Sequence, residues 1–194
     1  AIAEKTGQIL NIDRWVIRNS IAMLAQRGDF PPVPVSVNIS GRSFDDPSLP
    51  QYISEQLKHF GVTPEQLLVE LTETAAISDL HDAQRFIESL QQTGCKVCLD
   101  DFGAGFSSFT YLKHLKADIL KIDGQFIRDL PNDHDNQIFV KAIVDVARGL
   151  HKRTVAEFVE DAPTLEMLRT FGVDMVQGYH LNMPSADPPR MDFR

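Results

Sequence analysis

The fold of this chain is decided by residues 67–102, which read LLVELTETAAISDLHDAQRFIESLQQTGCKVCLDDF. The two ends of this stretch, Leu67–Glu73 and Cys95–Phe102, are short apolar runs typical of buried strands. Between them, His81–Thr93 has a helical pattern and is followed by Gly94, a residue type that often ends a helix in the left-handed conformation. The stretch therefore predicts a strand, a helix and a second strand parallel to the first.

The same alternation recurs along the rest of the 194-residue chain. It predicts further strands at Val33–Ser40, Asp118–Asp123, Arg153–Val159 and Asp174–His180. It predicts helices at Asp13–Gln26, Ser48–Phe60, Asn136–Arg148 and Asp161–Phe171, with left-handed glycine stops at Gly61, Gly149 and Gly172. Repeated units of this kind form a parallel sheet covered by helices, which is an α/β fold.

The ends of the six predicted strands favour a barrel over an open sheet. Each strand finishes with a polar or charged residue, and a buried polar end needs a partner or a metal. In a TIM-type barrel all carboxyl ends meet at one mouth, whereas an open doubly wound sheet gathers only those near its switch point. No glycine fingerprint of a dinucleotide fold follows the first strand.

Composition excludes several classes of protein. Hydrophobic residues make up 43% of the chain, which is enough for a core and argues against disorder. The formal net charge of −8 disfavours binding to a nucleic acid polymer. No apolar run approaches the roughly 20 residues of a membrane helix, so this domain is not expected to contact a membrane. We expect a cytoplasmic domain, or the cytoplasmic part of a larger, membrane-anchored protein.

The two cysteines, Cys95 and Cys98, have the C-x-x-C spacing of redox motifs. A redox pair usually lies at a helix N-terminus, but these residues fall within a predicted strand. Residues three apart on a strand point to opposite faces. We therefore interpret them as two buried, reduced thiols.

Polar side chains gather at the predicted mouth of the barrel. They are the acids Glu70, Asp100, Asp101, Asp123, Glu157 and Glu160, the amides Asn38 and Gln177, and one cation, Lys121. Oxygen donors select hard cations such as Mg²⁺, Mn²⁺ or Ca²⁺. Several carboxylates in one place cannot all ionise without cations, which predicts one or two bound metals. Two metals about 4 Å apart would suit attack on a phosphodiester.

Two features of this mouth leave alternatives open. Asp100 and Asp101 would face opposite ways on a regular strand, but Gly103 and Gly105 let the chain bend so that both can face one site. The segment up to residue 108 is then either a loop over the ligand or a surface turn without a role. Lys121 could form a Schiff base, act as a base, steady a phosphate, or balance neighbouring charges.

Six short motifs, each at a strand end, resemble those of the EAL-domain family of cyclic di-GMP phosphodiesterases. They are residues 37–40 (VNIS), 70–73 (ELTE), 100–103 (DDFG), 121–123 (KID), 156–160 (AEFVE) and 177–179 (QGY). The resemblance covers the whole chain and implies a modified TIM (β/α)8 barrel. It also implies hydrolysis of cyclic di-GMP to linear pGpG with two Mg²⁺ or Mn²⁺ ions. The signature Glu-Ala-Leu is absent, because the chain starts after that strand. We therefore expect an EAL domain over residues 1–194, without its first strand and incomplete at the N-terminus, with a C-terminal tail at 186–194. The Glu of the signature is a metal ligand in the family, so the 194 residues alone are not expected to be a good catalyst.

The resemblance also implies a role for each site residue. One metal would be held by Asn38, Glu70 and Asp100, and the second would lie among Asp100, Asp101 and Glu160. Lys121 and Glu157 would orient or deprotonate the attacking water, with the base left open between them. Gln177 would keep the site polar and hydrated. Glu73 would anchor the loop Phe102–Ser108, which in the family couples substrate binding to dimer contacts.

Three positions depart from the usual family residues: Ala104 replaces Thr, Phe106 replaces Tyr, and Phe158 replaces Gly. We expect Phe158 to face outward, pack against helices and leave Glu157 undisturbed. The family further implies a homodimer and fusion to regulatory domains. Two alternatives remain: a catalytically weak cyclic di-GMP receptor that signals through a partner or dimer, and an aldolase or lyase that uses Lys121 as a Schiff base.

Overall fold

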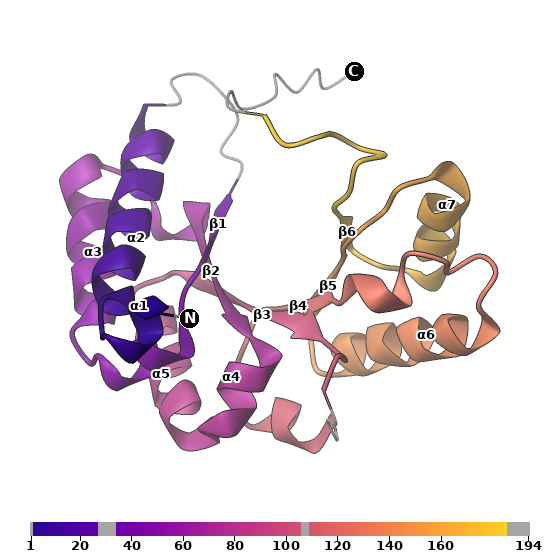
Figure 1. The fold of residues 1–194 in the computed structure, drawn as a ribbon, viewed down its shortest axis with the longest axis horizontal. Helices are drawn as coiled ribbons and strands as arrows, with labels where there is room; N and C mark the ends of the chain where they lie inside the picture. The colour runs from indigo at the N-terminus through magenta and orange to yellow at the C-terminus, as the bar shows by residue number, and fades with distance from the viewer. Residues whose placement is uncertain (1, 27–33, 106–108, 186–194) are drawn as a thin grey trace.

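The computed structural model describes residues 2–26, 34–105 and 109–185. Six parallel strands form one sheet in which each strand pairs with the next along the chain, in the order β1-β2-β3-β4-β5-β6. The sheet curls into an arc with the long helices on its outer side (Figure 1). Because this order never reverses among the described strands, the sheet is a curled half-barrel and not a doubly wound sheet.

All six predicted strands are present, most of them shorter than predicted. They are β1 (Val35–Asn38), β2 (Leu67–Thr72), β3 (Lys96–Phe102), β4 (Ile119–Ile122), β5 (Arg153–Ala156) and β6 (Met175–Val176). At the carboxyl ends, the predicted residues beyond these bounds have left the ladder: Glu73 begins α4, and the others lie in turns and loops. Val33, loop residues 106–108 and the 186–194 tail lie outside the described residues.

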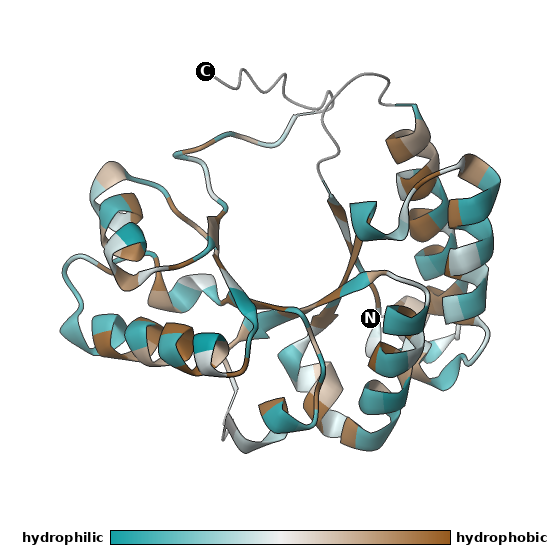
Figure 2. Cartoon of the chain, turned by 180° about the vertical axis from the view of Figure 1, so that it is seen from behind, coloured by the Kyte–Doolittle hydropathy of each residue, from teal (hydrophilic) through white to brown (hydrophobic). Residues whose placement is uncertain are grey.

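The five predicted helices are also present, with two short additional ones. The full set is α1 (Ile2–Lys5), α2 (Ile9–Ala25), α3 (Leu49–Phe60), α4 (Glu73–Ser78), α5 (Leu80–Gln92), α6 (His134–Gly149) and α7 (Ala162–Phe171). Short 3₁₀ turns are η1 (Gly41–Asp45), η2 (Pro64–Gln66), η3 (Phe109–Lys113) and η4 (Gly124–Phe126). Each long helix shows both hydrophobic and hydrophilic residues in Figure 2, as expected for helices with one buried face.

Three of the four predicted glycine stops are confirmed. Gly61, Gly94 and Gly172 have positive φ angles of 67°, 92° and 79°. The prediction for Gly149 is wrong, because it is the last residue of α6 and the left-handed residue is His151, with φ of 56°. The helical bonding extends further than the sequence indicates, since the Leu150 amide still donates to Val146 and Ala147.

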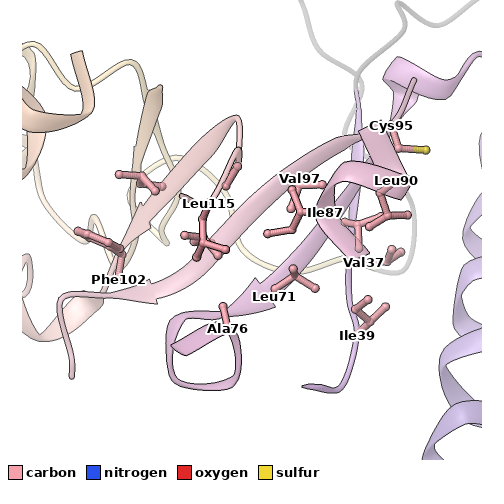
Figure 3. Close-up of a cluster of buried hydrophobic side chains, with 14 of the residues drawn as sticks. Val37, Ile39, Leu71, Ala76, Ile87, Leu90, Cys95, Val97, Phe102 and Leu115 are labelled. Carbon is pink, nitrogen blue, oxygen red and sulfur yellow. The ribbon is translucent and has the colours of Figure 1, made fainter. Parts of the chain in front are cut away.

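The hydrophobic core lies between the sheet and the outer helices. Leu71 and Val97 of the strands face Ile87 and Leu90 of α5, and all four are fully buried (Figure 3). Burial of each such side chain contributes about 1.5–3 kcal/mol to stability. Cys95 and Cys98 are buried free thiols, as interpreted from the sequence, and burial raises the pKa of both.

A buried carboxylate fixes the chain just after β1. Asp13 of α2 accepts hydrogen bonds from the Ser40 amide at 3.0 Å and the Ser43 hydroxyl at 2.6 Å. The burial of Asp13 is tolerated because its charge is hydrogen-bonded. The contact ties α2 to the segment that follows Asn38, so it holds the first strand end in place.

Candidate active site

A buried ionic cluster lies inside the curl of the sheet. The ammonium nitrogen of Lys121 is 3.0 Å from Glu70, 2.9 Å from Asp100 and 2.9 Å from Glu157. These residues come from β4, from β2 and β3, and from the loop after β5. We call this set of four residues the Lys121 cluster. It joins four of the residues that the sequence places at the mouth.

Strand alternation explains why Lys121 points into the curl. Its neighbours Leu120 and Ile122 are fully buried in the hydrophobic core, so the side chain between them lies on the opposite face. Lys121 is only 5% exposed, which is tolerated because three carboxylates surround its charge. Burial disfavours the charged amine, but these carboxylates outweigh it and raise the pKa of Lys121.

A β-bulge brings two consecutive acids to the same site. In the pairing of β3 with β4, Leu99 faces Leu120 and Phe102 faces Ile122, with a register shift between them. Two residues, Asp100 and Asp101, therefore occupy the space opposite one residue of β4. Asp101 itself is left-handed, with φ of 54°. The sequence attributed the bend to Gly103 and Gly105, but it begins at Asp101, a residue type that tolerates this conformation better than most.

Three carboxylates lie close enough to share one cation. Oxygen atoms of Asp100, Asp101 and Glu157 are all within 4.8 Å of one another, and we call these residues the acidic triad. Burial raises the pKa of Asp101, and the negative charge of Asp100 adds to this effect. Burial likewise raises the pKa of Glu157, although Lys121 opposes it. Negative charge is therefore in excess, and hard oxygen donors fit a divalent cation such as Mg²⁺ or Mn²⁺.

Three further predicted site residues, Asn38, Glu160 and Gln177, lie on the rim and are exposed. Asn38 is the last residue of β1 and pairs in register with Glu70. The backbone amide of Gln177 donates to the backbone carbonyl of Ala156 at 2.8 Å, next to Glu157. Glu160 follows in the same loop, but among the described residues the acidic triad does not include it. The structure thus brings Glu70, Asp100, Asp101, Lys121 and Glu157 together and leaves Asn38, Glu160 and Gln177 around them.

Glu73 holds the start of the loop after β3. It is 1% exposed, and one carboxylate oxygen accepts a hydrogen bond from the Gly103 amide at 2.9 Å. The Tyr111 hydroxyl donates to the other oxygen. These contacts are what a loop anchor requires. The role of Tyr111 as a partner of Glu73 was not predicted from the sequence, because nothing in its local pattern distinguishes it from an ordinary core aromatic residue.

Asp123, a mouth candidate from the sequence, serves a local purpose. Its carboxylate accepts a hydrogen bond from the Gln125 amide at 2.7 Å and so caps η4. Its charge also contributes to the raised pKa of Asp101. Asp123 therefore shapes the rim beside the acidic triad without belonging to it.

Comparison with known proteins places this site in a family. The family model described as EAL domain matches residues 1–184. The chain belongs to the EAL domain family. This EAL domain is 34% identical to the cyclic di-GMP phosphodiesterase PdeF of Escherichia coli over 184 residues, which cover 94% of this chain and 25% of PdeF. It spans about a quarter of the length of the curated relatives that it matches.

Solved EAL structures share this fold. The structure of the PaMucR phosphodiesterase in complex with c-di-GMP matches with a TM-score of 0.85 and 34% identity, covering 94% of this EAL domain and 75% of that chain. The FimX EAL domain from Pseudomonas aeruginosa bound to c-di-GMP matches with a TM-score of 0.87 and 34% identity, covering 95% and 74%. The curled parallel sheet is thus the TIM-barrel-like fold expected from the sequence. Within the described residues, no helix has the length and apolarity needed to cross a bilayer.

Proposed function

We propose that this EAL domain hydrolyses cyclic di-GMP to linear pGpG. The observation that carries the proposal is the Lys121 cluster adjoining the acidic triad at the mouth of the half-barrel. Relatives of similar sequence are named cyclic di-GMP phosphodiesterases, and similar structures hold c-di-GMP. The chemistry of the site and the names of its relatives support the same reaction.

The donor set supports two hard divalent ions, Mg²⁺ or Mn²⁺. We assign Asn38, Glu70 and Asp100 to one ion, and Asp100, Asp101 and Glu160 to the other. The close approach of Glu157 to Asp100 and Asp101 makes its carboxylate a further donor of the right type. When bound, the ions supply positive charge for the phosphodiester and lower the pKa of water.

The residues of this chain perform the remaining steps. Lys121 holds the carboxylates of Glu70, Asp100 and Glu157 in fixed positions through its three contacts. Lys121 and Glu157 orient the attacking water, and the carboxylate of Glu157 receives its proton, because Lys121 is already held as an ammonium ion. The water oxygen bonds to phosphorus, and the bond from phosphorus to the 3′ oxygen breaks. The leaving oxygen takes up a proton from solvent, to which Glu157 returns the proton that it received. Gln177 keeps the rim polar and hydrated.

A Schiff-base mechanism is disfavoured by the geometry. An amine that attacks a carbonyl needs a free lone pair, and burial alone would favour the neutral amine. Three carboxylates instead hold Lys121 as an ammonium ion. The aldolase or lyase alternative therefore does not fit this site.

We further propose that the domain works as a homodimer in the cytoplasm, fused to regulatory domains. The curated relatives are about four times as long as the matched region, which supports the fusion. Ile138 and Phe139 of α6 are exposed apolar residues, and Phe139 stacks on Phe126. A Cβ atom on Gly103 would contact the same Phe126 ring. This exposed face therefore adjoins the loop that Glu73 anchors. A dimer contact on this face would thus lie beside the loop that leads to the active site, and such proximity is needed to couple dimerisation to substrate binding.

Incubation with cyclic di-GMP and either Mg²⁺ or Mn²⁺ tests the proposed reaction. We expect linear pGpG by chromatography, and we expect Asp100→Ala to lose turnover because Asp100 belongs to both the Lys121 cluster and the acidic triad. The assay is run on this chain and on the longer protein that contains it. Absence of pGpG from both, with either metal, would overturn the proposal.

A receptor function is the second candidate, favoured by the structural similarity to the FimX EAL domain bound to c-di-GMP. Ala104, which replaces the usual family Thr in the anchored loop, is the departure that would weaken catalysis. Calorimetry with cyclic di-GMP in the presence of a chelator separates the two functions. Tight binding without metal and without turnover supports the receptor, whereas turnover excludes it.

A further inference from the structure

Phe158 has a backbone conformation that bulky residues rarely adopt. Its φ angle is 53°, in the left-handed region, and it lies between Glu157 of the Lys121 cluster and Glu160 of the rim. Left-handed backbone is strained for a residue with a large side chain, and it persists only where surrounding contacts impose it. The contacts around Phe158 therefore identify what holds this loop.

The pairing of the chain with β4 ends just before the left-handed residue, whereas its pairing with the segment after β6 continues past it. Before it, the Glu157 amide faces the Ile122 carbonyl of β4 at 3.5 Å. After it, the Val159 amide donates to the Gln177 carbonyl and the Val159 carbonyl accepts from the His180 amide, both at 3.0 Å. The Ala156 carbonyl before Phe158 also accepts from the Gln177 backbone amide at 2.8 Å, so the segment after β6 is bonded on both sides of the turn. The side chain of Glu157 contacts Lys121 at 2.9 Å immediately before this turn.

The Phe158 ring is held by two residues outside this loop. The Arg128 guanidinium lies over the ring, 4.3 Å from its centroid, in a cation–π contact. The ring also occupies the space where a side chain on Gly124 would stand, because a Cβ atom there would overlap ring carbon atoms. The side chain remains 43% exposed, so hydrophobic burial alone does not hold it. Phe158 faces outward, as expected from the sequence, and its packing partners are Gly124 of η4 and Arg128, which lies two residues beyond the end of η4.

We propose that Phe158 is a positioning residue, whose ring, seated on Gly124 and covered by Arg128, fixes the turn that places Glu157 on Lys121. The proposal rests on the proposed function and names a residue that acts on the reaction through Glu157. The ring contacts with Gly124 and Arg128 add to the backbone hydrogen bonds of Val159 in restraining the left-handed turn, whose conformation is unfavourable for a phenylalanine. Small displacements of a positioned carboxylate are costly to turnover.

Three substitutions distinguish the contribution of the Phe158 ring from that of the backbone conformation. Phe158→Ala removes the ring, Gly124→Ala displaces it without altering Phe158, and Phe158→Tyr retains it. We expect the first two to lower kcat about tenfold with KM within about twofold, and Phe158→Tyr to stay within about twofold of the wild type. His151→Ala is the matched control, because His151 is also a left-handed non-glycine residue and lies before β5, away from the mouth. It should leave kcat unchanged.

A readout independent of turnover keeps this test separate from that of the proposed function. Hydrogen exchange of the amides of residues 157–160, and the Lys121–Glu157 separation in a crystal structure of Phe158→Ala, report the position of the carboxylate directly. We expect faster exchange and loss of the 2.9 Å contact. If Phe158→Ala does not fold, Arg128→Met removes the guanidinium that covers the Phe158 ring. This variant should also exchange the amides of residues 157–160 faster. Unchanged exchange and an intact contact in the variants that fold would overturn the proposal, whether or not the wild type makes pGpG.

Discussion

The ammonium nitrogen of Lys121 lies 2.9 Å from the carboxylate of Glu157, although the two residues belong to different segments of the mouth. The same nitrogen is equally close to Asp100, so one cation joins the acidic triad to the Lys121 cluster. A single buried charge thereby sets the distance between groups that we propose to hold metal and to move a proton. Removing that charge is the most direct perturbation of the site.

Lys121→Met should abolish activity and destabilise the protein. It leaves buried carboxylates without a counter-charge, which typically costs about 3 kcal/mol or more in the free energy of unfolding. Lys116→Met is the matched control, because Lys116 pairs with Glu88 at the exposed surface. Urea unfolding and pGpG formation measure both variants. Equal stability of the two would show that the Lys121 cluster contributes no net electrostatic stabilisation.

Asp101→Asn should stabilise the metal-free protein at neutral pH while abolishing turnover. Folding raises the pKa of Asp101 from its ordinary value of 3.8, so the ionised carboxylate is less favourable in the folded state. This penalty is absent when both states are protonated, grows as the pH rises from the ordinary pKa through the raised folded pKa, and is complete above the folded pKa. Thermal unfolding at several pH values checks the sign, with the exposed Glu65→Gln as control. A lower melting temperature for Asp101→Asn at pH 7 would contradict the burial argument.

Metal ions should stabilise the wild-type protein, because they offset the excess negative charge of the acidic triad. At a concentration 100 times the dissociation constant, the gain is about 2.7 kcal/mol. Binding should weaken on acidification at a higher pH than for ordinary carboxylates, since protons compete at raised pKa values. Thermal shifts with Mn²⁺ between pH 5 and pH 8, in roughly one-unit steps, test this. Asp100→Ala should lose the shift, and a shift that it retains would place the metal elsewhere.

Glu73→Ala should loosen the loop after β3. It leaves the Gly103 amide and the Tyr111 hydroxyl without their carboxylate partner, at a cost of about 1–3 kcal/mol for the buried groups. Tyr111→Phe removes only one of these two bonds and should have the smaller effect. Urea unfolding gives the ranking, and pGpG assays give the effect on turnover. If Tyr111→Phe were the more damaging, Glu73 would not be the anchor.

The order and type of the main elements could be predicted from the sequence. Apolar runs, helical patterns and terminal glycines are local signals, and the alternation of strand and helix determines a parallel sheet with consecutive strands adjacent. The same reasoning places Glu70, Asp100, Lys121 and Glu157 at one mouth, because the carboxyl ends of parallel strands share an edge. The EAL resemblance assigned roles to these residues, and the variants described above test those roles.

Only the tertiary structure decided which of these side chains touch. Lys121 contacts Glu70 across 51 positions of sequence, and that contact depends on the curl and register of three strands, which hydropathy does not encode. The left-handed turns at Asp101 and Phe158 were likewise hidden, because neither residue type signals such a conformation by itself. Local patterns reflect where a residue is buried, whereas the partners of a buried charge are set by how distant segments pack.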